Sequence, residues 1–182
     1  AITPIQQYSY TQGKNATDSA MIIDAMDILY SGRVEGFCIV SSDSDFTRLA
    51  TRLREAGMKV IGIGEKKTPG PFITACDKFI YIEILASEDS PGARGKKLHK
   101  DQQLDKRVIS LIKSSINDVA DESGWAFLGE VGTLILKKQP NFDPRNYGFK
   151  KLLYVMKSID SIEIDERQSE KAGTRHVYVR VK

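Results

Sequence analysis

The sequence predicts an α/β domain with a mostly parallel sheet, followed by a small winged-helix domain. Over residues 1–85, short apolar strands alternate with helical stretches, which is typical of a parallel α/β layer with right-handed connections. Residues 102–182 show three helical stretches and then two strands of period two, which is the order of elements in a winged helix. Residues 86–101 are rich in small, charged and turn-forming residues, so we expect a flexible linker there.

The main chemical signal lies at residues 37–46. An apolar strand over 37–41, expected to be buried on both faces, is followed by Asp43 and Asp45, and a helix then runs from Phe46 to Gly57. In open α/β sheets, ligands bind outside the carboxyl ends of the strands. Asp43 could simply cap the helix, but capping needs one carboxylate. Two carboxylates this close repel each other, and a hard cation such as Mg²⁺ or Mn²⁺ relieves that repulsion.

A third carboxylate is expected at the same edge of the sheet. A strand over residues 4–10 and a polar loop precede a helix over 17–30, and Asp18 lies at the start of that helix. Its predicted buried face consists of Met21, Ile22, Ala25, Met26 and Leu29. Further strands are predicted over 58–64 and 79–84, with a helical turn over 72–76 between them. Asp77, before the last strand, is a weaker site candidate because it could cap a turn.

Composition excludes several classes of protein. The 182 residues contain no apolar run long enough to cross a membrane and no signal-peptide pattern at the start. The two histidines offer neither a triad nor a metal pair, and Cys38 and Cys76 are interpreted as reduced core residues, so we expect a cytoplasmic protein. Lys and Arg outnumber Asp and Glu by fourteen to eleven over residues 102–182, against nine to ten over residues 1–85. This asymmetry suits a metal-holding front part and a phosphate-contacting back part.

The first 85 residues resemble the NYN domains, PIN-like ribonucleases that include the LabA-like bacterial group. The resemblance is carried by four segments, of which the Ser-x-Asp-x-Asp-Phe element is the most specific: residues 14–18, 39–46, 56–64 and 75–80. It implies a Rossmann-like PIN fold and a metal-dependent nuclease, a hydrolase of phosphodiesters, with Asp18, Asp43 and Asp45 as catalytic residues and ligands of Mg²⁺ or Mn²⁺. Family members begin with a strand that ends in Asp. The sequence from Ala1 lacks that strand, so we expect the NYN domain to be truncated at its N-terminus and catalysis by this polypeptide alone to be in question.

The back part of the chain is expected to fold as helices over 104–124, 129–138 and 144–158, with strands over 162–165 and 176–181. Asp143 and Pro144 are the predicted N-cap and first residue of the third helix. Residues 124–128, 131–132, 142–152 and 177–180 resemble the LOTUS domain, also called OST-HTH, which implies RNA binding or, in some members, docking of a protein partner. Trp125 and Phe142 are expected in the core. The best candidates for phosphate contacts are Arg145, Lys150, Lys151 and Arg175.

Three functions follow as expectations. The first is a metal-dependent endoribonuclease in which a LOTUS module holds single-stranded or structured RNA, with no membrane partner and with homo-oligomerisation left open. The alternative is a non-catalytic RNA-binding or regulatory protein whose PIN-like site is incomplete. A third, a transferase acting on a nucleotide-bound metal through the Asp-x-Asp pair, fits the acidic motif but not the attached winged helix.

Overall fold

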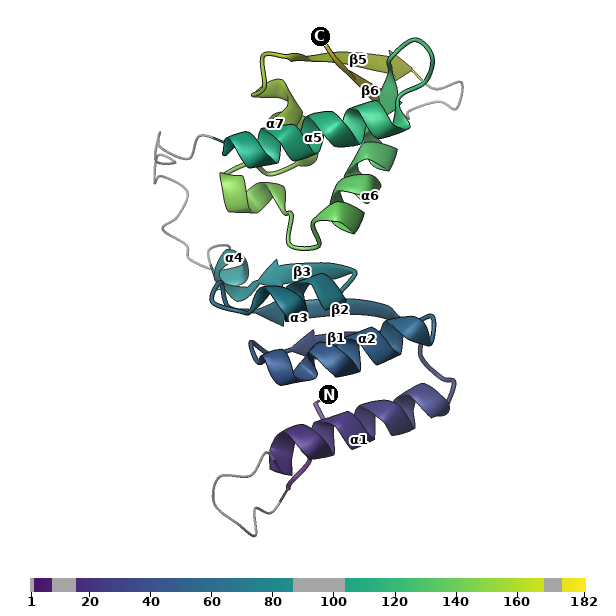
Figure 1. Ribbon diagram of the computed structural model, residues 1–182, viewed down its shortest axis with the longest axis vertical. Helices are drawn as coiled ribbons and strands as arrows, with labels where there is room; N and C mark the ends of the chain where they lie inside the picture. The colour runs from purple at the N-terminus through teal and green to yellow at the C-terminus, as the bar shows by residue number, and fades with distance from the viewer. Residues whose placement is uncertain (1, 8–15, 87–103, 169–174) are drawn as a thin grey trace. The chain divides into compact units, whose positions relative to one another are not determined.

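The computed structural model describes residues 2–7, 16–86, 104–168 and 175–182 (Figure 1). The chain divides into two compact units, Ala1–Phe79 and Ile80–Lys182, and each is described by itself. No helix within the described residues is both long and apolar enough to pass through a bilayer.

The first unit is an α/β layer built on three parallel strands in the order β1-β2-β3. Its elements are α1 (Ala16–Tyr30), β1 (Gly36–Val40), the 3-10 turn η1 (Ser44–Phe46), α2 (Thr47–Glu55), β2 (Lys59–Gly64), α3 (Gly70–Ala75) and β3 (Lys78–Tyr81). In the register of β1 and β2, Gly36 lies beside Lys59 and Val40 beside Ile63. The predicted fold class is confirmed.

The core of this unit forms between the sheet and the two short helices α2 and α3. Leu49, Ala50 and Leu53 are buried on one face of α2, as the i, i+3, i+4, i+7 spacing predicted. Between α3 and β3, the rings of Phe72 and Phe79 meet edge to face with centroids 5.9 Å apart. Cys76, only 1% exposed, completes this core, in agreement with its predicted position.

Two predictions of burial were wrong. β1 is not buried on both faces, because it lies at the edge of the described sheet: Val40 is 64% exposed and Cys38 is exposed, whereas Ile39 between them is buried. In helix α1 no residue is fully buried: Ile23, outside the predicted face, is 60% exposed, and the five residues of the predicted face are only half-buried, namely Met21, Ile22, Ala25, Met26 and Leu29.

Two predicted strands also differ from the structure. Residues 2–7 form no strand, and the rest of the predicted strand over 4–10 lies outside the described residues. The strand predicted over 79–84 ends at Tyr81, where the chain turns into the short helix α4 (Ile82–Ala86). A helix face and a short buried strand cannot be told apart over so few apolar residues.

The second unit has the helices and small antiparallel sheet of a winged helix, as predicted. Its elements after α4 are α5 (Lys106–Val119), β4 (Ala126–Phe127), α6 (Leu128–Lys138), the 3-10 turn η3 (Pro144–Tyr147), α7 (Leu152–Lys157), β5 (Ile162–Gln168) and β6 (Arg175–Val181). The strands lie in the order β4-β6-β5, with Ile164 opposite Val179. Ile112, Ile116, Val131, Ile135, Val155 and Val179 form the fully buried centre of the core, and Phe142 packs there as expected.

The predicted third helix is interrupted. Asp143 caps the 3-10 turn, which ends at Gly148. Gly148 lies in the left-handed region (φ +80°), a backbone conformation that residues other than glycine rarely adopt. The chain is then extended at Lys151 before α7 begins at Leu152. The glycine, placed in the middle of an otherwise helical stretch, was the available signal for this break.

Candidate active site

The turn between β1 and η1 places two carboxylates at the carboxyl end of a strand. The Ser41 amide donates to the Ile63 carbonyl at 2.9 Å, which extends the pairing of β1 with β2 by one residue. The Asp43 amide then donates to Ser41 Oγ at 3.0 Å, and the Asp45 amide to Asp43 Oδ1 at 2.9 Å. Asp43 therefore caps η1 with one oxygen, and these bonds fix the Asp43 carboxylate and the backbone of Asp45 beyond the sheet.

The neighbouring strand fixes this turn from the side. The Glu65 amide donates to Ser42 Oγ at 2.8 Å, so the residue after β2 is tied to the residue after Ser41. Gly64 makes the close approach possible: a Cβ there would lie 2.5 Å from the Ser41 carbonyl oxygen and 2.8 Å from Thr68 Oγ1. Thr68 is itself buried and donates to the Glu65 carbonyl at 2.6 Å.

The structure brings Asp18 to the same point. Asp18 lies in the first turn of α1, and one carboxylate oxygen from each of Asp18, Asp43 and Asp45 lies within 4.8 Å of the others. Asp18 is half-buried and the other two are exposed. Three like charges at this spacing repel one another, because water screens them only in part. The arrangement therefore favours a positive partner.

The donor set suits a hard divalent cation. Carboxylate oxygens are the ligands that Mg²⁺ and Mn²⁺ prefer, and exposed sides leave room for the water molecules that Mg²⁺ retains. Metal–oxygen distances of about 2.1 Å put two ligands on one ion at most about 4.2 Å apart. The three oxygens, within 4.8 Å of one another, are thus close to ligation distance.

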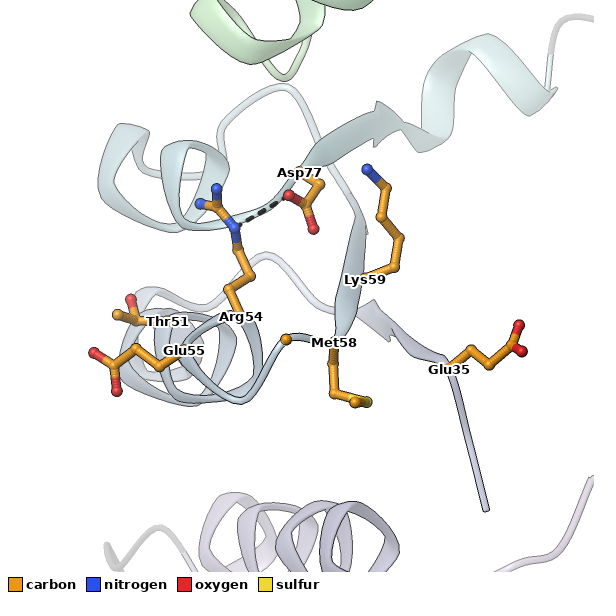
Figure 2. Close-up of a pocket in the computed structure, with 8 residues that line it drawn as sticks. Glu35, Thr51, Arg54, Glu55, Met58, Lys59 and Asp77 are labelled. Carbon is orange, nitrogen blue, oxygen red and sulfur yellow. Dashed lines mark ion pairs between the residues drawn. The ribbon is translucent and has the colours of Figure 1, made fainter. Parts of the chain in front are cut away.

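Asp77 is not part of this group. It lies at the opposite end of the sheet, where Oδ2 accepts from the Val60 amide at 2.8 Å and Oδ1 pairs with Arg54 Nε at 3.2 Å (Figure 2). Arg54 also donates to the Ala75 carbonyl at 3.3 Å. These contacts join α2, β2 and the segment before β3 beside a pocket of about 570 Å³ that Lys59 also lines. Asp77 is a structural residue here, which agrees with its ranking below the other three.

Comparison with known families decides the architecture. The NYN domain family matches residues 1–83, and the OST-HTH/LOTUS domain family matches residues 100–172. The chain is an NYN domain joined to an OST-HTH/LOTUS domain. The resemblance inferred from the sequence is therefore confirmed for both halves.

Two solved structures are similar to this chain. An uncharacterized protein of Nitrosomonas europaea, solved by solution NMR, is 30% identical over 52% of this chain and 90% of its own, with a TM-score of 0.41. Part of a Chromobacterium violaceum protein, also solved by NMR, is 34% identical over 47% of this chain and 84% of its own, with a TM-score of 0.32. No curated protein gives a significant match.

The predicted RNA contacts on the LOTUS domain lie in different settings. Arg145 is held by the buried Asp143, to which Nε donates at 3.0 Å and Nη2 at 2.8 Å. Lys150 and Lys151 are exposed, and they precede α7 instead of lying on a helix. Arg175 begins β6, and its side chain lies outside the described residues. The RNA-binding role of these four residues stays a prediction.

Trp125 was placed wrongly from the sequence. It is half-buried and lies outside the core, with the guanidinium of Arg180 4.7 Å and that of Arg167 5.7 Å from its ring centroid. The alternation of β6 contained the signal, because Val177, Val179 and Val181 alternate with the polar and aromatic residues His176, Tyr178 and Arg180. His176, Tyr178 and Arg180 form a second face of the strand, and Trp125 lies against Arg180 on that face.

Proposed function

We propose that the NYN domain is a metal-dependent endoribonuclease and that the LOTUS domain holds its RNA. The observation that carries the proposal is the convergence of Asp18, Asp43 and Asp45, from two separate segments, to within 4.8 Å. In this proposal the three carboxylates bind Mg²⁺ or Mn²⁺ and are the catalytic residues. The NYN match supports a nuclease-type domain, and the LOTUS match supports an RNA-binding module.

The acidic residues of the NYN domain would hold the ion and so position it against the phosphate. A divalent ion, when bound, supplies a Lewis acid for the phosphate and lowers the pKa of water for in-line attack. Asp43 and Asp45 are preorganised for binding by the hydrogen bonds of the β1–η1 turn, so little rearrangement is needed. The three acidic groups also exclude the phosphate from the site in the absence of a cation, since like charges repel.

The LOTUS domain would supply affinity for RNA through its cations. Lys150 and Lys151 are neighbouring exposed cations that could contact phosphates without reading sequence. Arg145 is a positioned guanidinium whose pairing with Asp143 fixes its direction. Binding through such contacts weakens as salt rises, because it depends on release of counterions from the nucleic acid.

The test is a cleavage assay of the complete protein on single-stranded RNA with Mn²⁺. We expect Asp18→Asn and Asp45→Asn each to lower the cleavage rate at least about 100-fold, because each removes a ligand of the ion that stabilises the transition state. Asp27→Asn, on the exposed side of the same helix as Asp18, is the matched control and should cleave normally. Cleavage that persists in both Asp43→Asn and excess EDTA would refute the metal mechanism.

A non-catalytic RNA-binding protein is the second candidate. It is favoured by the capping bond from the Asp45 amide to Asp43 Oδ1, which gives Asp43 an ordinary structural use. This candidate predicts RNA binding that is unchanged by Asp45→Asn and no cleavage with any divalent ion. Binding and cleavage measured on the same samples separate the two candidates.

A further inference from the structure

A pocket of about 360 Å³ opens on the LOTUS domain where the end of α5, the start of α6, β4 and β6 meet. Its apolar lining comes from Val119, Trp125, Phe127 and Tyr178. The rings are arranged as a cluster, with the centroid of Phe127 5.8 Å from that of Tyr178 and 5.6 Å from that of His176. The pocket therefore presents several aromatic surfaces around one small volume.

Two carboxylates complete the lining. Glu130 lies in the first turn of α6 and is exposed, and Asp121 lies in the loop after α5. Asp121 Oδ1 accepts from the amides of Ser123 and Trp125 and from Ser123 Oγ, which anchors the loop against the pocket. These hydrogen bonds, led by that of the Ser123 hydroxyl, lower the pKa of Asp121, so its carboxylate is charged at neutral pH.

The aromatic rings here already attract cations. The Arg167 guanidinium lies 4.2 Å from the Tyr178 ring centroid, and that of Arg180 lies over Trp125. Each of these arginines is also paired with a carboxylate, Arg167 with Asp165 of its own strand β5 and Arg180 of β6 with Glu163 of β5. Their charges are therefore offset within the protein.

The acidic groups of the pocket are not offset in this way. Neither Asp121 nor Glu130 forms an ion pair with any residue that the structure describes, although Arg167 contributes an electrostatic attraction to Asp121. The pocket thus combines aromatic surfaces with carboxylates, and a phosphate group entering it would be repelled. Aromatic surfaces next to acidic groups are the usual means of binding an alkylammonium or guanidinium group.

We propose that this pocket binds an arginine or lysine side chain of a basic segment in a protein partner, separately from the RNA-binding residues of the domain. The cation would lie against the ring of Phe127 beside Trp125, with its charge near Glu130 and Asp121, because Arg167 and Arg180 already lie over the rings of Tyr178 and Trp125. The two carboxylates favour a basic peptide over RNA as the occupant, because RNA would bring phosphate charge to an acidic surface.

Trp125 makes the proposal directly measurable, because it is the chain's single tryptophan. The full chain is titrated with an acetylated and amidated tetra-arginine peptide while tryptophan emission is recorded. The matched probe is the same peptide with citrulline in place of arginine, which keeps the shape and removes the charge. We expect a saturable change with the arginine peptide and none with citrulline.

Glu130→Gln tests the pocket itself. It removes one charge from an exposed helix position, and we expect the affinity for tetra-arginine to fall about twofold to fivefold, the effect of one exposed charge pair. Glu122→Gln, an exposed neighbour outside the pocket, is the control and should bind as the unaltered chain does. Asp121 is left unchanged, because its hydrogen bonds hold the loop and its loss would disturb Trp125.

Three results would overturn the proposal. Equal responses to the citrulline and arginine peptides would show that charge is not recognised. Equal weakening by Glu130→Gln and Glu122→Gln would show general attraction without a pocket. A change in Trp125 emission with single-stranded RNA but not with either peptide would assign the pocket to RNA instead.

Discussion

Replacing Gly64 by alanine should destabilise the NYN domain and leave the LOTUS domain unchanged. An added Cβ would lie 2.5 Å from the Ser41 carbonyl oxygen, 2.8 Å from Thr68 Oγ1 and 3.0 Å from Phe79 Cζ. Ordinary carbon–oxygen contacts are about 3.3 Å, so the chain after β1 would have to move by roughly 0.8 Å. This is the segment that leads into Asp43.

The size of the effect follows from overpacking. Forcing one methyl group into a filled space between backbone atoms costs about 1–3 kcal/mol, because neither the strand nor the buried Thr68 can move freely. At 1.4 kcal/mol for each factor of ten, the population of open NYN domain should rise about 5-fold to 150-fold.

Thiol labelling measures that population in the NYN domain alone. Cys76 is 1% exposed and becomes reactive only when the domain opens, whereas Cys38 is exposed and is first replaced by serine. The rate of Cys76 labelling in the Gly64→Ala protein, relative to the parent, then gives the change in the opening equilibrium. Urea unfolding followed by tryptophan emission reports on the LOTUS domain and should not change.

Gly70→Ala is the matched control for this experiment. It makes the same chemical change in the same domain, but a Cβ at Gly70 meets no atom within 4 Å. Alanine should leave Cys76 labelling unchanged or slow it slightly, since it restricts the unfolded chain. Equal labelling rates for the two variants would refute the claim that Gly64 is required by close packing.

Three further predictions concern stability, pH and RNA. Asp143→Ala should cost the LOTUS domain about 2 kcal/mol, because it removes the cap and the buried acceptor of a guanidinium; urea unfolding followed by tryptophan emission measures this, and an unchanged midpoint would contradict it. Burial raises the pKa of the Cys76 thiol to about 11, whereas the thiol of the unfolded chain ionises at its ordinary pKa. The free energy of unfolding should therefore fall by about 2 kcal/mol as the pH rises from the ordinary thiol pKa to 11. Urea unfolding followed by circular dichroism should show this loss, and Cys76→Ala should abolish it. Lys150→Ala and Lys151→Ala should each weaken RNA binding and reduce its salt dependence by about one released ion, unlike Lys157→Ala at the far end of α7, which is the control in a fluorescence anisotropy titration.

The sequence predicted the elements that follow strong local rules. The buried face of α2 and its end at Gly57 followed from helical spacing and from a glycine that the structure places at φ +80°. Asp18 lies close to Asp43 and Asp45 as predicted, but the start of α1 places it there, because residues 2–7 do not form the strand from which its position was inferred.

The errors arose where tertiary context overrides local pattern. The apolar residues of β1 predict burial, but exposure depends on what lies beside the strand, and no periodicity encodes that for Val40. Trp125 was expected in the core because large aromatic residues usually bury most of their area, yet two arginines of the adjacent strands cover its ring at the surface. At Gly148 the local signal for a break was present, since a glycine at φ +80° interrupts an otherwise helical stretch.

The absence of a buried residue in α1 has a consequence for the acidic group. Asp43 and Asp45 are supported by a bonded turn, whereas Asp18 depends on a helix that gains little from packing. Any ion that gathers all three carboxylates must therefore also hold that helix in place, and part of its binding free energy is spent on doing so. Ion affinity and the protection of the α1 amides against hydrogen exchange are then two measures of one equilibrium, and a substitution that anchors the helix would strengthen both.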